Sequence, residues 1–368
     1  MKKIVFGITN LSIGGAEKTL VDLSNTLCDK YDITILTLYG QGELEKKLSP
    51  NIKIINLYKN AFEKINSIKK FLISLRLLFM KKNIYKKYIK NKFDIEIAFL
   101  EGPITNLFSV KNKQTKKIAW IHTNISLIFG NNLKAKIKKI INKKIYNKYD
   151  NLVFISQSAL DNFNNTFNIN VEKHVINNYI NINNILELSN EEIDFKYDKN
   201  TINFLSVCRL VKPKAINRLI KIHSKLLAEG YYHKFYIIGD GPEKENLKNM
   251  IKKLNVENTF FLLGEKKNPY PYIKKCDHFC LLSYYEGYGI VVEEAKALQK
   301  QIIITNTASK EALTDYENKI ILENNENDIY TGLKNIILNN KNENNNNLIK
   351  YEFNNDSILK KIMEILGD

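Results

Sequence analysis

Two glutamates eight positions apart, with two glycines between them, are the residues of this sequence best suited to chemistry: Glu286-Gly-Tyr-Gly-Ile-Val-Val-Glu-Glu294. The segment follows a predicted strand and opens a predicted helix, whose free N–H groups and positive dipole end attract anions. Gly287 and Gly289 allow the backbone to approach a phosphate or a sugar closely. Glu286 can accept hydrogen bonds from sugar hydroxyls, and Glu294 from a vicinal diol such as a ribose. A glycine turn with two solvated glutamates explains this segment alone equally well.

A second chemically suggestive segment is Arg209-Leu-Val-Lys-Pro-Lys214, which follows the predicted strand Ile202–Cys208. Two cations held at the end of a buried strand can stabilise the charge that builds on a diphosphate leaving group. Taken alone, a basic loop that caps a helix is the simpler interpretation. The position of this segment in the same domain as the glutamate pair favours the chemical one.

The N-terminal half offers three further candidates. Gly14 and Gly15 lie between the first predicted strand and helix; they lack the G-x-G-x-x-G spacing of a dinucleotide site, but they can still bring backbone to a phosphate. His122 ends a predicted strand and can hydrogen-bond a ligand hydroxyl, with a backbone-bonded histidine as the alternative. Glu101, after the preceding strand, is a weaker candidate for contact with a ligand.

Cysteine spacing gives little support for a metal site. Cys276 and Cys280 flank His278, but no second pair of ligands accompanies them. We expect no metal and no disulfide framework.

The alternation of short apolar runs with amphipathic stretches predicts an α/β chain with two parallel sheets. The expected organisation is a Rossmann-like domain over residues 1–176, a polar linker over 177–200, a second Rossmann-like domain over 201–345, and a C-terminal helix over 346–368 that can cross back to the first domain. The natural ligand site in such a chain is the cleft between the domains, at the carboxyl ends of both sheets.

The positive charge is confined to one half of the chain. Residues 1–175 carry the whole net charge of +17, with 30 Lys+Arg against 13 Asp+Glu. The remaining residues have 26 basic and 26 acidic side chains. Two acid-free stretches, Lys64–Lys92 and Leu133–Lys148, combine lysines with apolar residues at helical spacing. They predict binding to an anionic membrane surface, with a solvated helix face as the alternative.

No secretory leader and no apolar run long enough to span a bilayer is visible in the sequence. We therefore expect a cytoplasmic protein, peripheral to the inner face of the cytoplasmic membrane.

Taken in order, these features resemble the retaining family 4 glycosyltransferases of the GT-B fold, in which two Rossmann-like domains face each other across a cleft. The matching segments cover most of the chain: Gly14-Gly15-Ala16-Glu17, Arg209 with Lys214, Ile238-Gly-Asp-Gly-Pro242, Leu262-Leu-Gly264, and Glu286 with Glu294.

The resemblance implies transfer of a sugar from a nucleotide diphosphate, with retained anomeric configuration and neither metal nor cofactor. The implied donor-binding residues are Gly14, Gly15, Arg209, Lys214, Gly239, Leu263, Gly264, Glu286, Gly287, Tyr288, Gly289, Ile290 and Glu294. The implied catalytic residues are Glu286, His122, Arg209 and Lys214, with Glu101 and His122 on the acceptor side. The basic first domain fits a glycan or lipid-linked acceptor in bacterial capsule, lipopolysaccharide or other surface polysaccharide assembly.

Three segments depart from the family pattern. Ala215 stands where a glycine usually follows the lysine, Gln299-Lys300-Gln301 replaces a small turn, and the downstream glycine-rich loop reads Thr307-Ala-Ser-Lys310. A UDP-sugar is the expected donor by analogy. The alternatives are a GDP-mannose-dependent mannosyltransferase, a GT-B-like epimerase or phosphorylase, and a basic nucleic-acid-binding protein. For the last of these no helix-turn-helix or aromatic-interleaved basic strand is visible, so nucleic acid is not an expected partner.

Overall fold

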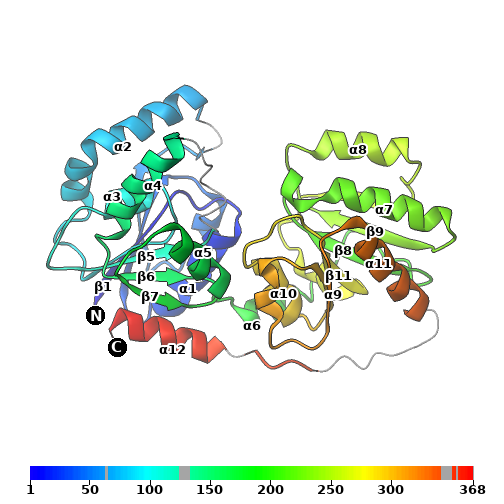
Figure 1. Ribbon diagram of the computed structural model, residues 1–368. Coiled ribbons are helices and arrows are strands. Elements are labelled where there is room, and N and C mark those ends of the chain that lie inside the picture. Colours follow the sequence, from blue (N-terminus) through cyan, green and yellow to red (C-terminus); the bar gives the residue numbers. More distant parts are fainter. Residues whose placement is uncertain (63–64, 124–132, 341–349, 354, 368) are drawn as a thin grey trace. The chain divides into compact units, whose positions relative to one another are not determined.

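The chain folds into two compact units, each built on one parallel sheet. The computed structural model describes residues 1–62, 65–123, 133–340, 350–353 and 355–367. Unit 1 comprises Met1–Ile180 together with Asn354–Asp368, and unit 2 comprises Asn181–Phe353 (Figure 1). The expected boundary between residues 345 and 346, and the start of the basic stretch at Lys64, lie outside the described residues.

Unit 1 holds a seven-stranded sheet in the order β3-β2-β1-β4-β5-β6-β7, and every pair of neighbours is parallel. Its strands are β1 (Lys3–Ile8), β2 (Asp32–Tyr39), β3 (Lys53–Tyr58), β4 (Ile95–Ala98), β5 (Lys116–Ile121), β6 (Asn151–Phe154) and β7 (Glu172–Val175). The central strands are buried along nearly their whole length, because helices cover both faces of the sheet.

The connections of unit 1 divide its helices between the two faces. Its helices are α1 (Gly15–Leu27), η1 (Glu43–Lys47), α2 (Ser67–Tyr88), α3 (Pro103–Phe108), α4 (Leu133–Tyr146), α5 (Gln157–Thr166) and α12 (Asn355–Leu366). From β3 onward the chain advances steadily across the sheet, so right-handed connections place α2, α3, α4 and α5 on one face and α1 on the other. α2 packs on α3, and α3 on α4, as a continuous layer (Figure 1).

Unit 2 holds a six-stranded parallel sheet in the order β10-β9-β8-β11-β12-β13. Its strands are β8 (Ile202–Val207), β9 (His233–Ile238), β10 (Phe260–Gly264), β11 (His278–Leu281), β12 (Gln301–Thr305) and β13 (Lys319–Leu322). Its helices are α6 (Ile182–Leu188), η4 (Lys212–Lys214), α7 (Ile216–Ala228), α8 (Lys244–Lys253), α9 (Tyr270–Lys275), α10 (Ile290–Ala297), η5 (Ala308–Leu313) and α11 (Glu326–Asn340). The two Rossmann-like units confirm the predicted α/β fold class.

The topology places the chemically interesting residues at two sheet edges. In unit 2, Arg209 and Lys214 follow β8, and Glu286 follows β11, its neighbour in the sheet. In unit 1, Glu101 follows β4 and His122 follows β5, which are also neighbours. All the strands are parallel, so each group lies at the carboxyl edge of its own sheet.

Candidate functional site

The loops after β8 and β11 are joined by a direct ion pair. Lys214 Nζ donates to Glu286 Oε1, and Ser283 Oγ donates to the same oxygen at 3.3 Å. The backbones are tied as well, because the Tyr284 N–H donates to the Pro213 carbonyl at 2.8 Å. Both side chains of the pair are mostly buried, at 20% exposed for Lys214 and 10% for Glu286, so the pair is held more firmly than a surface salt bridge.

Ala215 follows Lys214 in a backbone conformation that favours glycine. It caps the amino end of α7 with φ +55° and ψ +27°, in the left-handed region. An L-residue there costs roughly 1–2 kcal/mol that a glycine does not. The alanine at this turn therefore carries an energetic cost that a glycine would avoid.

The Arg209 side chain is exposed, and its guanidinium forms no hydrogen bond or ion pair with any described residue. Its loop is packed on the loop after β9, where Gly239 has φ +140° and a Cβ would lie 2.0 Å from the Cys208 carbonyl oxygen. A Cβ on Gly241 would lie 2.4 Å from the Leu210 carbonyl oxygen. The two glycines therefore support the loop that presents the Arg209 guanidinium at the sheet edge.

The amino end of α10 opens beside the Lys214–Glu286 pair. Gly289 caps the helix with φ +74°, and a Cβ on it would come within 3.4 Å of Ser309. Tyr288, between the two glycines of the loop, is buried. Glu294 is also buried, and its Oε1 accepts a hydrogen bond from the Tyr270 hydroxyl at 3.2 Å. Ser283 and Tyr270, which hold the two glutamates, carry no sequence signal and were missed.

Leu263 and Gly264, two of the implied donor-binding residues, end β10 at the same sheet edge. Gly264 has φ +71° with open space where a Cβ would be, and its carbonyl accepts from the Gly239 N–H at 2.8 Å. Leu263 is partly exposed. The donor residues that the sequence predicts in unit 2 thus share one edge of one sheet.

In unit 1, Glu101 organises the turn that carries His122. Its Oε1 accepts from the backbone N–H of His122 at 2.8 Å, from that of Thr123 at 2.7 Å, and from Thr123 Oγ1 at 2.9 Å. Its Oε2 and the Nε2 of His122 are buried atoms with no hydrogen-bond partner among the described residues. Unsatisfied buried polar atoms are rare in folded proteins, so these two atoms mark this turn as a candidate site.

Burial sets the protonation state of His122. It lowers the pKa of the imidazole to about 3, against a smaller opposing effect from a hydrogen bond with the Phe99 backbone. The ring lies 4.7 Å, centroid to centroid, from that of Phe99. Burial also raises the pKa of the Glu101 carboxyl, opposed by the hydrogen bonds from Thr123 and His122. His122 is therefore neutral near pH 7 and can offer one nitrogen as donor and the other as acceptor.

The Gly14-Gly15 turn is less open to an anion than its sequence indicates. Gly14 caps α1, and a Cβ on it would lie 2.2 Å from Glu17 Oε2, so the Glu17 carboxyl folds back over the turn. Burial raises the pKa of Glu17. An ionised carboxylate here would repel a phosphate, so any anion at this turn requires Glu17 to be protonated or to move.

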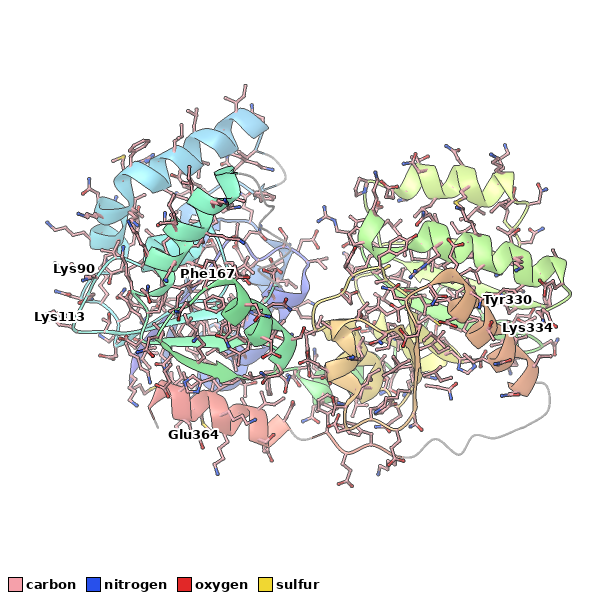
Figure 2. All side chains as sticks on the ribbon, in the orientation of Figure 1. Lys90, Lys113, Phe167, Tyr330, Lys334 and Glu364 are labelled. Carbon is pink, nitrogen blue, oxygen red and sulfur yellow. The ribbon has the colours of Figure 1, made fainter. Side chains whose placement is uncertain are left out.

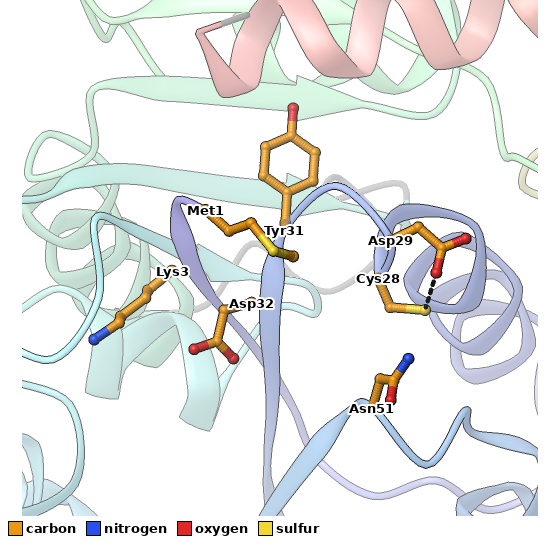
Figure 3. Close-up of a pocket in the computed structure, with 7 residues that line it drawn as sticks. All are labelled: Met1, Lys3, Cys28, Asp29, Tyr31, Asp32 and Asn51. Atoms are coloured by element: carbon orange, nitrogen blue, oxygen red, sulfur yellow. Dashed lines mark hydrogen bonds between the residues drawn. The ribbon is translucent and has the colours of Figure 1, made fainter.

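A shallow pocket lies elsewhere in unit 1 and is unrelated to these residues. It is lined by Met1, Lys3, Cys28, Asp29, Tyr31, Asp32 and Asn51 (Figure 3). Because β1 and β2 begin at Lys3 and Asp32, this pocket is at the amino edge of the first sheet, opposite to His122.

The cysteine–histidine segment of unit 2 is packed in the core. Cys276 and Cys280 are buried free thiols, and Cys276 Sγ donates to the Ile273 carbonyl. Among the described residues no group of three His, Cys, Asp or Glu side chains is placed to hold a metal ion. The absence of a metal requirement stays a prediction.

Comparison with sequence families assigns both halves of the chain. The family described as "Glycosyltransferase Family 4" matches residues 13–184, and the one described as "Glycosyl transferases group 1" matches residues 189–355.

Among characterised relatives, the chain is 30% identical over 345 residues to N-acetylgalactosamine-N,N'-diacetylbacillosaminyl-diphospho-undecaprenol 4-alpha-N-acetylgalactosaminyltransferase of Campylobacter jejuni, covering 92% of this chain and 90% of the relative. It is 28% identical over 308 residues to a second N-acetyl-D-galactosaminyltransferase of that organism, covering 80% and 77%.

Solved structures show the same fold. TarM superposes with a TM-score of 0.74 at 17% identity over 100% of this chain and 99% of that one. HepE from Anabaena, solved in complex with UDP and glucose, gives 0.74 at 16% identity over 100% and 99%. The family matches and these shared folds together identify a glycosyltransferase of the GT-B fold. The chain belongs to glycosyltransferase family 4, and its second half matches the group 1 glycosyltransferases.

Proposed function

We propose that this glycosyltransferase moves a sugar from a UDP-sugar to a lipid-linked glycan, with retained anomeric configuration and without a metal. The observation that carries the proposal is the Lys214–Glu286 pair, set beside the exposed Arg209 and the amino end of α10. Together these place two cations, a carboxylate and a helix N-terminus at one sheet edge.

The proposed roles follow from the chemistry of each group. As the bond between the anomeric carbon and the phosphate oxygen breaks, negative charge grows on the departing diphosphate, and Arg209 and Lys214 offset it in place of a metal. Glu286 accepts hydrogen bonds from donor-sugar hydroxyls, and Glu294 from the ribose diol. Leu263-Gly264 borders the base, and the neutral His122 bonds a sugar or acceptor hydroxyl.

The acceptor class is inferred from relatives. The two Campylobacter enzymes are named for acceptors on diphospho-undecaprenol, one Staphylococcus aureus relative is a poly(ribitol-phosphate) alpha-N-acetylglucosaminyltransferase, and two Escherichia coli relatives belong to O-antigen biosynthesis. These names support an acceptor that carries phosphate and is tied to a membrane or cell envelope. An assembly pathway for surface polysaccharide is the corresponding proposal for this chain.

Two helices of unit 1 supply the proposed membrane-facing surface. On α2, Ile68, Leu72 and Phe79 are 72%, 57% and 80% exposed and share one side of the helix, opposite to the buried Ile73 and Leu77. Such large exposed apolar side chains are unusual without a partner.

α4 repeats the pattern, and the surroundings are basic. Ile137, Ile140 and Ile141 are 52%, 57% and 51% exposed, and the helix lies on the same sheet face as α2. Lys90 and Lys113 project from unit 1 (Figure 2). Among the described residues no helix could span a bilayer. Apolar ridges flanked by lysines suit the interface of an anionic leaflet, and we place the enzyme at the inner face of the cytoplasmic membrane, where nucleotide sugars are available.

Nucleotide release from a panel of UDP- and GDP-sugars tests the proposal, with and without a polyisoprenyl-diphosphate-linked glycan. We expect UDP release from UDP-sugars only, accelerated by the acceptor, and a product of the donor's anomeric configuration. GDP release would replace the donor with GDP-mannose or a relative. Conversion of the sugar without transfer would indicate an epimerase, and no turnover at all would refute the proposal.

A further inference from the structure

A buried ion pair lies on α10 directly behind the donor loop. Glu293 and Lys296 are 4% and 3% exposed, and Lys296 Nζ lies 3.5 Å from Glu293 Oε2. Lys296 also donates to the Ala312 carbonyl at 2.9 Å and to Asp315 Oδ1 at 2.7 Å. A buried pair of this kind contributes little net stability compared with apolar side chains of the same size.

One end of this network reaches the loop between the two glycines. The Tyr288 hydroxyl donates to Glu293 Oε1 at 2.5 Å, and both side chains are buried. The hydrogen bond joins the loop residue to the helix that also carries Glu294. It therefore fixes the orientation of the loop relative to α10.

The other end reaches a strap formed by residues 350–353, which precedes the chain's return to unit 1. The Tyr351 hydroxyl donates to Asp315 Oδ2 at 2.5 Å, and Lys296 Nζ lies 4.5 Å from the centre of the Tyr351 ring and 5.2 Å from that of Phe353. The strap is thus bound to the same lysine that pairs with Glu293.

Gln299 is one of the departures from the family pattern. Its side-chain amide binds the backbone of the strap. Gln299 Nε2 donates to the Tyr351 carbonyl at 2.9 Å, and the Tyr351 N–H donates to Gln299 Oε1 at 2.8 Å. The residue adopts φ +57°, a backbone conformation that favours glycine. These two hydrogen bonds explain why a glutamine occupies a position whose backbone conformation favours glycine.

We propose that the strap at residues 350–353 is a positioning element of the donor site, which holds α10 through Gln299 and Lys296 and sets the donor loop through Glu293 and Tyr288. The inference rests on the proposed donor site at Glu286–Glu294. It adds residues that touch no donor but act through α10, and it assigns the C-terminal segment a role in nucleotide binding.

The test is calorimetric titration of the full-length protein with UDP at 25 °C. Gln299→Ala removes both backbone bonds, and Tyr351→Phe removes one hydroxyl. We expect each to weaken UDP binding by roughly three- to tenfold and to raise the donor KM with kcat changed less than about twofold, because Arg209, Lys214 and Glu286 are untouched. Tyr330→Phe is the matched control, since the Tyr330 hydroxyl bonds Glu229 on an exposed part of unit 2 (Figure 2).

Thermal unfolding without UDP separates positioning from stability. Variants that melt earlier but bind UDP as the wild type does would show that the strap is only structural and would overturn the inference. If the wild type and the strap variants bind UDP equally well, the proposed role of the strap is refuted and the proposed function stands. A wild type that binds neither UDP nor GDP would refute both.

Discussion

Lys214 and Glu286 come from loops 72 positions apart in the chain and meet over neighbouring strands. The sequence predicts each of them as a candidate from its own motif. Their pairing follows only from the sheet order, in which β8 and β11 are adjacent although they are not consecutive in the chain. Neither Ser283 nor Tyr270 could be found in this way, because a serine at a strand end and a tyrosine in a helix have no distinctive spacing.

The pair should act as a unit in catalysis. We expect Lys214→Ala and Glu286→Gln each to lower kcat/KM by about 100-fold or more, and the double variant to be little worse than either, because each residue holds the other in place. Steady-state kinetics on the three variants measure this. Lys212→Ala, an exposed lysine in the same turn, is the control. Losses that multiply in the double variant would show that the two residues act independently.

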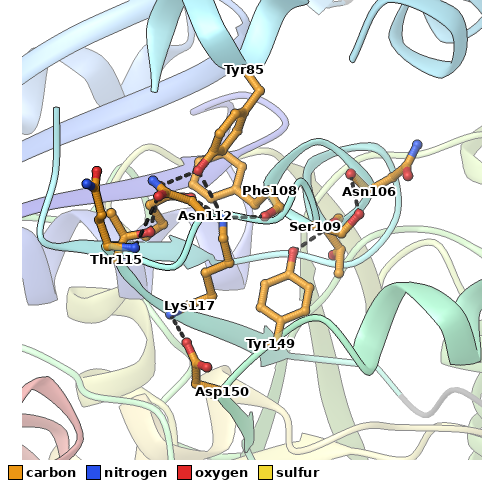
Figure 4. Close-up of polar contacts among 12 residues, drawn as sticks. Tyr85, Asn106, Phe108, Ser109, Asn112, Thr115, Lys117, Tyr149 and Asp150 are labelled. Atoms are coloured by element: carbon orange, nitrogen blue, oxygen red, sulfur yellow. Dashed lines mark hydrogen bonds and ion pairs between the residues drawn. The ribbon is translucent and has the colours of Figure 1, made fainter. Parts of the chain in front are cut away.

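At the scale of the element, α2 is fastened to the first sheet by a buried polar cluster (Figure 4). The Tyr85 hydroxyl on α2 donates to Glu96 Oε1 on β4 at 2.6 Å, and Thr115 Oγ1 donates to the same atom at 3.0 Å. Lys117 on β5 donates to Glu96 Oε2 and, at 2.8 Å, to the Phe108 carbonyl. Burial lowers the pKa of Lys117, and the nearby Glu96 opposes that shift.

Breaking this cluster should destabilise unit 1 unevenly. Lys117→Met leaves the Glu96 carboxylate buried without its cation and should cost about 3–5 kcal/mol, whereas Tyr85→Phe removes a neutral hydroxyl that bonds Glu96 and Lys117 and should cost about 1–3 kcal/mol. Adding Glu96→Gln to Lys117→Met should recover much of the loss. Trp120, the chain's single tryptophan, lies on β5 in unit 1, so its fluorescence during urea unfolding follows this unit. Equal losses in the two single variants would contradict the account.

In unit 2, a chain of hydrogen bonds joins two fully buried histidines at the amino edge of the sheet. His233 Nδ1 lies 2.8 Å from the Tyr231 carbonyl, His233 Nε2 lies 2.9 Å from His223 Nδ1, and His223 Nε2 lies 2.9 Å from Thr259 Oγ1. A carbonyl can only accept, so His233 Nδ1 carries a proton and donates it to the Tyr231 carbonyl. Burial lowers the pKa of His223 to about 2 and that of His233 to about 4.

Unit 2 should therefore lose stability in acid. In the unfolded chain both histidines have a pKa near 6.5, so they bind a proton more readily there than in the folded protein. Their contribution to the free energy of unfolding is therefore complete above pH 6.5 and is lost as the pH falls towards 4. For each histidine that is protonated only in the unfolded chain, the free energy of unfolding should fall by about 1.4 kcal/mol per pH unit as the pH is lowered. Far-UV circular dichroism follows both units, and the Trp120 signal identifies unit 1. A His223→Gln variant should show a shallower slope of stability against pH than the wild type. Equal slopes in the variant and the wild type would refute the assignment of the acid sensitivity to these histidines.

Most strands of both sheets could be predicted from buried apolar runs, but the strands β7 and β13 and the helix α6 could not. β7 (Glu172–Val175) is a polar edge strand, and β13 (Lys319–Leu322) is a short partly exposed one, so neither shows the uniform burial of a central strand. α6 (Ile182–Leu188) begins in the polar stretch expected to be a linker. Its Asn181 cap, which accepts from the Asn184 N–H, was the available signal.

At the scale of the whole molecule, the excess positive charge and the exposed apolar ridges occur in the same unit. Wild-type protein should float with anionic vesicles in a sucrose gradient and should bind less as salt rises, because screening weakens the attraction. Phe79→Ser should weaken binding by about tenfold, corresponding to about 1.4 kcal/mol of lost apolar burial. The Phe79 side chain points away from the core, so the substitution should not affect folding.

The control for this surface is Tyr232→Ser, which removes a side chain 52% exposed in unit 2. It should leave flotation unchanged. Equal binding to neutral and anionic vesicles, or no effect of Phe79→Ser, would assign the basic face of unit 1 to another purpose.

The central claim is that Arg209 and Glu294 serve a nucleotide-sugar donor at the carboxyl edge of the second sheet. The most direct test is the rate of UDP release from a UDP-sugar by purified wild type, Arg209→Ala and Glu294→Gln, with Arg76→Ala on the exposed side of α2 as the control. We predict that both site variants stay folded and lose about 100-fold or more of the rate, while Arg76→Ala keeps it. Unchanged turnover in folded Arg209→Ala or Glu294→Gln would contradict the account.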